Sequence, residues 1–109
     1  MSASNDLTSM GYALASAFVA RDRRPVRFMY REPPDNADDS GWRFFSGDEP
    51  QAYVDDPANI GIYALTTIAA IDPSVAPLLG TTAPCAFERP DATAPFARSD
   101  FDFAPEEDG

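Results

Sequence analysis

The chain has 109 residues, and its 44% hydrophobic and 24% charged residues are ordinary values for one small globular domain rather than for a disordered chain. Its 18 acidic and eight basic residues give a formal net charge of −10, so we expect nucleic acid and anionic membranes to repel it and a basic partner to be attracted. The absence of histidine excludes histidine-based catalytic and zinc sites, the single cysteine excludes an internal disulfide, and no apolar run is long enough to span a membrane.

Residues 1–10 are polar and are expected to be a flexible N-terminus. The apolar stretch at 10–20 is similar to the core of an export signal, but it lacks the basic start of one. The residues before it include Asp6 and neither arginine nor lysine. We therefore interpret the stretch as part of the fold. We expect a cytoplasmic protein, whose unpaired Cys85 suits a reducing compartment.

The first half of the chain predicts strands. Residues 12–20 fit either a helix, which their alanines favour, or a strand. Residues 26–31 alternate in character and predict one strand, and the aromatic residues 42–45 predict a second. We expect these two strands to pair antiparallel across the loop between them. Phe44 and Phe45 then point to opposite faces of the sheet.

The second half predicts a loop, a helix and a short strand. Residues 48–59 form an acidic loop whose last residue, Asn59, is suited to cap a following helix. Apolar residues at helical spacing predict a helix over 62–71. Asp72-Pro73 ends this helix, because the residue before a proline avoids helical backbone. We expect one further helical turn after it and a short strand at 85–89.

The last residues, 90–109, are rich in proline and acids and are expected to be a partly disordered tail. The aromatic residues Phe96, Phe101 and Phe103 either add an edge segment to the core or lie in this tail. The predicted fold class is α+β, in one domain at 11–89. It consists of a small antiparallel sheet of three to five strands with one main helix and a short second helical turn, and the main helix covers one face of the sheet.

Catalytic chemistry has little support in the sequence. No histidine or lysine is present to activate a serine or threonine, and the apolar surroundings of Cys85 are typical of a small core residue. There is no GxGxxG motif and no phosphate-binding loop with a lysine. Carboxylate pairs can support hydrolysis, but nothing marks a buried pair here. We therefore expect no enzyme activity, no cofactor and no metal.

The acidic loop offers the strongest chemical alternative. Its oxygen ligands are of the kind that Ca²⁺ and Mg²⁺ prefer, and they come from Asp48, Glu49, Asp55, Asp56 and Asn59. The calcium-binding pattern of an EF-hand fails whether it starts at Asp55 or at Asp56, because the required ligands and glycine do not both fall in place. Two interpretations stay open: a nonstandard divalent-ion site, and a solvated loop whose side chains bond the backbone of turns.

A long ordered string of residues occupies the middle of the chain. It reads MYREP at 29–33, DSGWRFFSGDE at 39–49, DDPANIGIY at 55–63 and AFER at 86–89. This string resembles the DUF2185 family, also catalogued as the immunity protein 33 family. The chain departs from the family pattern at Pro34 and Ala64, where acids are usual, and in its acidic tail.

The resemblance implies a small bacterial α+β domain with a strand at 12–16. It also implies membership of polymorphic toxin systems, in which a small cytosolic protein neutralises a cognate toxin. It carries over no catalytic residues. The change at Ala64 weakens the idea that this part of the surface binds through charge.

The motif residues define a candidate site at the loop end of the predicted pair of strands. There, Arg31 or Arg43 is placed to form an ion pair with one of the nearby acids, which are Glu32, Asp39, Asp48 and Asp55. In one interpretation, Trp42 packs in the core and these ion pairs brace the loops. In the other, the motif and the acidic loop form a surface for a partner. The candidate partner-binding residues are Tyr30, Arg31, Glu32, Ser40, Trp42, Arg43, Asp48, Glu49, Asp55, Asp56 and Asn59.

The favoured function is therefore that of a non-enzymatic cytoplasmic immunity protein, whose partner is a protein toxin with a basic surface, such as a nuclease. The first alternative is a stand-alone cytoplasmic domain with a regulatory or small-ligand role, which a pocket lined by Trp42, Tyr30 and Arg31 would favour. The second alternative is a divalent-ion-dependent enzyme built on the loop at 48–59. The sequence does not determine the oligomeric state.

Overall fold

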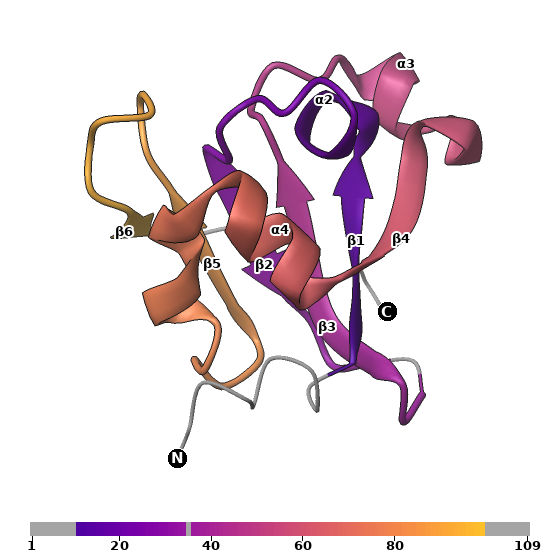
Figure 1. The fold of residues 1–109 in the computed structure, drawn as a ribbon, viewed down its shortest axis with the longest axis vertical. Coiled ribbons are helices and arrows are strands. Elements are labelled where there is room, and N and C mark those ends of the chain that lie inside the picture. Colours follow the sequence, from indigo (N-terminus) through magenta and orange to yellow (C-terminus); the bar gives the residue numbers. More distant parts are fainter. Residues whose placement is uncertain (1–10, 35, 100–109) are drawn as a thin grey trace, which may run out of the picture.

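The computed structural model describes residues 11–34 and 36–99. Within them the chain forms one six-stranded sheet in the order β4-β1-β3-β2-β5-β6 (Figure 1). The strands are β1 (Tyr12–Ser16), β2 (Phe28–Arg31), β3 (Asp39–Phe45), β4 (Ile60–Ala64), β5 (Cys85–Glu88) and β6 (Ala97–Arg98). The α-helices are α2 (Ala17–Ala20), α3 (Gln51–Val54) and α4 (Leu65–Ile71), and the 3₁₀-helices are η2 (Pro57–Asn59) and η3 (Pro73–Leu78).

The α+β class is confirmed, and the sheet corrects the prediction in two respects. It has six strands in the described residues, not three to five, and it is mixed, because β1 pairs parallel with β3. The other neighbouring strands pair antiparallel. A parallel pair needs a crossover connection, here through α2 and β2, and a local sequence pattern does not show which distant strand will become the neighbour.

The predicted antiparallel pair is confirmed as β2 and β3. Met29 pairs with Phe44, and Arg31 pairs with Trp42. The observed strands differ from the predicted ones at their beginnings, since β2 starts at Phe28 and β3 already at Asp39. The segment that connects them therefore lies at one end of the sheet.

The helix predicted over 62–71 is wrong in its first part. Ile60–Ala64 is strand β4, which pairs antiparallel with β1 along its whole length, and the helix begins only at Leu65. The apolar spacing of this segment fits both a helix and a strand. As a strand it pairs with all five residues of β1, and a helix here would leave that edge of β1 without these backbone partners. Asn59 consequently caps no helix. The helix ends at Ile71, directly before Asp72-Pro73, as predicted.

The ambiguous segment 12–20 contains both of the elements considered for it. Its first part is β1, as the family resemblance implied, and its last four residues form α2. Ser16 caps this helix, because its Oγ accepts a hydrogen bond from the Val19 amide at 3.4 Å. The predicted turn and short strand are also present, as η3 and β5.

The main core lies on one face of the sheet, where α4 crosses β2 and β3 (Figure 1). Trp42, Phe44 and Met29 point into it and have no exposed surface. The indole Nε1 of Trp42 donates to the Leu79 carbonyl at 3.0 Å, so this buried ring is fully satisfied. Cys85 is buried as predicted, and burial raises the pKa of its thiol, which keeps it protonated.

Part of the predicted tail belongs to the sheet. Residues 97–98 form β6 on the edge of β5, and Phe96 packs against the core. The first of the two alternatives therefore holds for Phe96. Phe101 and Phe103, the predicted flexible N-terminus at 1–10 and the end of the tail lie outside the described residues. None of the helices described here has the length and apolar character to cross a membrane.

Candidate functional site

The predicted ion pair at the loop end of β2 and β3 is made by Arg43. Its guanidinium donates to both carboxylate oxygens of Asp39, at 2.8 and 2.9 Å, and to Glu32 at 2.8 Å. Burial alone would lower the pKa of Arg43, but these two carboxylates raise it, so the charge is held firmly. Asp39 also accepts the Gly41 amide at 2.9 Å. The network therefore braces the start of β3.

Gly41 explains why the motif needs a glycine at this bend. Its φ is +88°, and a Cβ placed there would lie 2.2 Å from the carbonyl oxygen of Glu32. Any other residue would be strained and would push the two strands apart. The glycine in the family string is thus explained by the close approach of β2 and β3.

The burial of the motif residues separates the two interpretations. Trp42, Ser40 and Arg43 are buried, so a partner could not reach them without displacing the residues that cover them. Arg31 donates to the carbonyls of Ser40 and Thr81, at 2.9 and 2.8 Å, and its guanidinium lies 5.8 Å from the Trp42 ring. Burial and hydrogen bonding thus favour the core-packing interpretation for this group. Tyr30, Arg31 and Glu32 are half-buried and stay candidates for partner contact.

The acidic loop is held together by its first two acids, Asp48 and Glu49. Asp48 pairs with Arg27 at 2.6 Å and lies 3.7 Å from Arg24. The arginines considered for it from the sequence, Arg31 and Arg43, are not its partners. Glu49 accepts the Ser46 and Gly47 amides, at 2.7 and 2.9 Å, and the hydroxyl of Ser16. Burial would raise the pKa of Glu49, but these donors lower it, so it stays ionised as a brace between the loop and β1.

The later part of the loop has separate local roles. Asp56 accepts the backbone amide of Ala58 at 3.0 Å and caps η2, and the side-chain Nδ2 of Asn59 donates to the Tyr53 carbonyl at 3.0 Å. Asp55 is exposed. In the described ranges 11–34 and 36–99, no three Cys, Asp or Glu side chains gather as a metal ion would require. The carboxylate oxygens of Asp48, Glu49 and Asp56 thus bond an arginine, backbone amides and the Ser16 hydroxyl.

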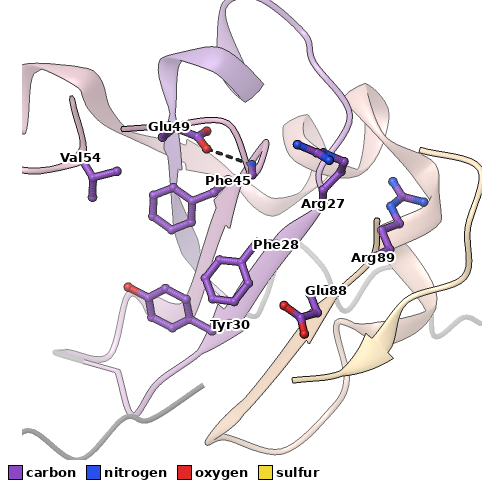
Figure 2. A pocket seen from close by; sticks show the side chains of 9 residues that line it. Arg27, Phe28, Tyr30, Phe45, Glu49, Val54, Glu88 and Arg89 are labelled. Carbon is purple, nitrogen blue, oxygen red and sulfur yellow. Dashed lines mark hydrogen bonds between the residues drawn. The ribbon is translucent and has the colours of Figure 1, made fainter. Parts of the chain in front are cut away.

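The structure places a pocket on the opposite face of the sheet, which we call the outer face. It is the face whose side chains alternate with the core residues and point away from α4. Phe28 and Tyr30 of β2 and Phe45 of β3 lie side by side there (Figure 2), with ring centroids 5.8 to 6.2 Å apart. The pocket has a volume of about 540 Å³, and Val54 closes one side.

Sequence reasoning missed most of this pocket, although part of the signal was available. Phe44 and Phe45 point to opposite faces as predicted, since Phe44 is buried in the core and Phe45 is partly exposed on the outer face. The same alternation along β2 places Phe28 and Tyr30 beside Phe45. Of the predicted site residues, only Tyr30 and Glu49 line the pocket. Trp42 and Arg31, which together with Tyr30 would have lined the pocket that favours a small-ligand role, do not line this one.

Two arginines form the polar wall of the pocket, and each is already bonded to carbonyls and to one carboxylate of the chain. Arg27 donates to the carbonyls of Ser46 and Pro90, both at 2.9 Å, and to Asp48 at 2.6 Å. The other, Arg89, closes the AFER string and is held still more deeply. Figure 2 shows both side chains on one side of the three rings, beyond Phe28.

Arg89 links four segments of the chain. It donates to the Val26 carbonyl at 2.9 Å, to the Ala92 carbonyl at 3.1 Å and to Asp72 at 2.7 Å. Asp72 also accepts the Val26 amide at 2.9 Å. Burial would raise the pKa of Asp72, but hydrogen bonds from Ser74 and Val26 together with the charge of Arg89 lower it. The Arg89–Asp72 ion pair is therefore buried and structural, and we call it the buried tie.

One carboxylate at the pocket has no such bond. Glu88 lies opposite Phe28 in the β2–β5 pair and is exposed. No other described residue forms a hydrogen bond or ion pair with its carboxylate. The pKa of the nearby Tyr30 is raised, mainly by burial and further by Glu32, so its phenol is neutral. The pocket thus offers an aromatic surface, bound arginines and an available negative charge.

The model of one protein family, the Immunity protein Imm33 domain, matches residues 13–100. This range includes every residue that lines the pocket and the buried arginine network, and the match confirms the resemblance seen in the sequence. No curated protein and no solved structure matches the chain.

Proposed function

The chain belongs to the Imm33 immunity protein family, and from this membership we propose that it is a non-enzymatic binding protein that neutralises a cognate bacterial toxin. The single observation that carries the proposal is the family match at 13–100, which spans nearly all of the described sheet. Neutralisation by binding means that the chain occupies the active site of the toxin or a surface beside it.

The outer face supports the proposal as the surface that meets the toxin. It carries Phe28, Tyr30 and Phe45, and on β4 it carries Ile62, whose side chain is 67% exposed. Aromatic residues are enriched where protein interfaces gain most of their binding energy. A single exposed apolar side chain is ordinary on a folded surface, so Ile62 supports the proposal only through its place on the same face as the three rings.

The charge of the chain supports a basic toxin, such as a nuclease, acting in the cytoplasm. A net charge of −10 speeds the encounter with a positively charged partner and slows the encounter with acidic ones. Of the predicted partner-binding residues, Asp55 and Asp56 are exposed and Glu32 is half-buried, and all three are candidates for the rim of such an interface. Trp42, Ser40 and Arg43 are buried, and they support this surface indirectly by holding β3 in place.

The test begins with the tagged chain used as bait in a lysate of its own host at moderate salt, with mass spectrometry of the proteins retained. A captured protein is then expressed in a test bacterium with and without the chain. We expect it to stop growth alone and to be tolerated when the chain is present. If no captured protein is toxic, or if the chain does not protect against the toxic one, the proposal fails.

The pocket keeps the small-ligand role as a second candidate function. Its volume of about 540 Å³ falls within the usual range of small-molecule sites, about 300 to 1,000 Å³. Native mass spectrometry of the chain purified from its host distinguishes the two roles. A small molecule retained at one per chain, together with no captured toxin, would favour the stand-alone domain.

A further inference from the structure

We infer that the free edge of strand β4 is a self-association site, at which a second copy of this chain adds its own β4 antiparallel and extends the sheet. The site consists of Ile62, Tyr63 and Ala64. It lies apart from the pocket, and the inference does not depend on the proposed toxin.

The first argument is the direction of the backbone groups of β4, which forms one edge of the sheet (Figure 1). In an antiparallel pair, every second residue turns its N–H and C=O groups away from the neighbouring strand. Ile60 is such a residue, because its amide donates to a carbonyl of η2 and not to β1. At the other end of the pair, Tyr12, which lies opposite Ala64, donates its amide to Asp38 on the β3 side. Ile62 lies between these positions and therefore directs both of its backbone groups to the free edge.

Two neighbouring elements limit this edge to three residues. The 3₁₀-helix η2 occupies the edge at Ile60, whose N–H is bound there. The helix α4 begins after Ala64, and Ala64, as its N-cap, turns its carbonyl into the first helical turn. Within the described part of the chain, both backbone groups of Ile62 and the amide of Ala64 are left without a sheet partner. A strand that pairs here must therefore be short.

A second copy meets this limit because the edge is complementary to itself. A two-fold axis through Tyr63 places Ile62 of each copy opposite Ala64 of the other. Each Ala64 amide then donates to the opposite Ile62 carbonyl, and each Ile62 amide faces the second lone pair of an Ala64 carbonyl. The Ile62 side chain, which is 67% exposed, lies against the small side chain of the exposed Ala64. Opposite side chains share a face, so the outer faces of both copies lie on the same side of one continuous sheet.

The second argument is the absence of charge around β4. Residues 57–87, which form β4, α4, η3 and most of β5, contain one charged residue, Asp72, and it is bound to Arg89 in the buried tie. Two copies with a net charge of −10 each repel one another, so they approach most easily where no acids meet. Interface cores are also depleted in charged residues. The uncharged region therefore favours a second copy over a basic partner at this edge.

The opposite edge of the sheet differs from β4 in each feature that prevents pairing. There, β6 has only two residues, follows Pro95 closely and carries the charge of Arg98. Short length, a nearby proline and a charged side chain are common means of preventing edge-to-edge association of sheets. By contrast, β4 has five residues and contains neither proline nor a charge. Of the two edges in the described sheet, β4 is therefore the one that favours pairing.

The experiment measures the molecular mass of the complete chain by sedimentation equilibrium at concentrations up to about 1 mM. We expect the mass to rise from that of one chain, 11.8 kDa, toward twice that value, as for a weak dimer with a small interface. Because salt screens like charges, raising NaCl from about 0.1 to about 0.5 M should strengthen the dimer severalfold. A chain that stays monomeric throughout would overturn the inference. A dimer that salt weakens would also overturn it, because such a dimer joins charged surfaces.

Ile62→Asp tests the location of the site. It should weaken the dimer about tenfold, because it removes an apolar contact and brings an acid from each copy to the pairing edge. The matched control is Ala97→Asp, which places the same charge at an exposed position on the opposite edge and should leave the dimer unchanged. Circular dichroism verifies that both variants keep the fold. Equal dimerisation of the two variants would show that the copies join elsewhere and would overturn the inference.

Hydrogen exchange gives a test that needs no substitution. The Ala64 amide is hydrogen-bonded only in the dimer, so its exchange should slow severalfold as the concentration rises, whereas that of the Arg98 amide at the opposite edge should not. An Ala64 amide that exchanges equally fast at every concentration would overturn the inference. The proposed function fails separately: a dimer without a captured toxin leaves the edge site standing, and a monomer that protects against a toxin leaves only the immunity role standing.

Discussion

The two faces of the sheet differ although the same strands build both. On the inner face, Met29 and Phe44 are wholly buried beneath α4. One residue along each strand, Tyr30 and Phe45 lie on the outer face and are only partly buried. Both faces are aromatic, and among the described residues α4 covers the inner one. The comparison separates aromatic residues that are wholly buried under a helix from aromatic residues that keep part of their surface exposed.

The largest expected effect is on the inner face, with Trp42→Ala. This ring is fully buried and also donates a hydrogen bond, so its loss should lower the free energy of unfolding by about 3 to 5 kcal/mol. Phe45→Ala on the outer face is the matched change and should cost clearly less. Urea denaturation followed by circular dichroism measures both, because the chain has one tryptophan and its fluorescence is lost in the first variant. Equal losses would contradict the division between the faces.

The next effect tests the buried tie beside the pocket, with Asp72→Asn. The change leaves Arg89 without its carboxylate and weakens the bond to the Val26 amide, which should cost about 2 kcal/mol. Asp48→Asn removes a charge from an ion pair whose partners are both substantially exposed, and it should cost less than about 1 kcal/mol. The midpoints of urea denaturation compare the two variants. A larger loss of stability in Asp48→Asn would show that the acidic loop, not the buried tie, supports the structure beside the pocket.

A smaller effect is expected from pH. The pKa values of Glu49 and Asp72 are lower in the folded chain than in the unfolded chain, so as the pH falls the unfolded chain takes up protons first. The stability that these carboxylates provide is therefore present at neutral pH and is lost as the pH falls below about 4.5 through the folded-state values.

Urea denaturation at pH 7, 5 and 3 measures this loss, and Glu49→Gln should reduce its size because one of the two titrating groups is gone. A stability that rises toward pH 3, or the same acid loss in Glu49→Gln as in the unchanged chain, would contradict the assignment of Glu49 as an ionised brace.

The smallest effect is expected for Ile62→Ser. This side chain is 67% exposed on the outer face, so the free energy of unfolding should change by no more than about 0.5 kcal/mol. Ile68→Ser in α4, which is fully buried, is the matched control and should be strongly destabilising. A large loss in Ile62→Ser would mean that the outer face is covered within the chain itself, and that it is a second core rather than a surface for a partner.

Local sequence patterns were sufficient for features that depend on neighbouring residues. The period of two at 26–31 identified β2, and the aromatic, β-prone residues at 42–45 identified β3. The opposite directions of Phe44 and Phe45 followed, because a strand alternates its side chains whatever lies above it. The proline after Asp72 ended α4 for a steric reason that needs no tertiary contact. The motif string identified the family, because its length and order make it specific.

Other features depend on segments that are distant in the sequence. Ile60–Ala64 is a strand because β1 offers a free edge, although its apolar spacing is also helical. Arg43 pairs with Asp39 and Glu32, and Asp48 pairs with Arg27, because of where the loops bring these charges, and composition alone leaves every such pairing open.

The pocket belongs to the same class of features. Its rings come from two paired strands, its wall from a helix near 54, and its charged edge from β5, so no continuous stretch of sequence contains it. The amino-acid sequence determined which residues alternate, where elements stop and to which family the chain belongs, since those properties are local or cumulative. The folded chain determined which aromatic face is closed and which carboxylate is left available, since both depend on contacts between segments that only folding brings together.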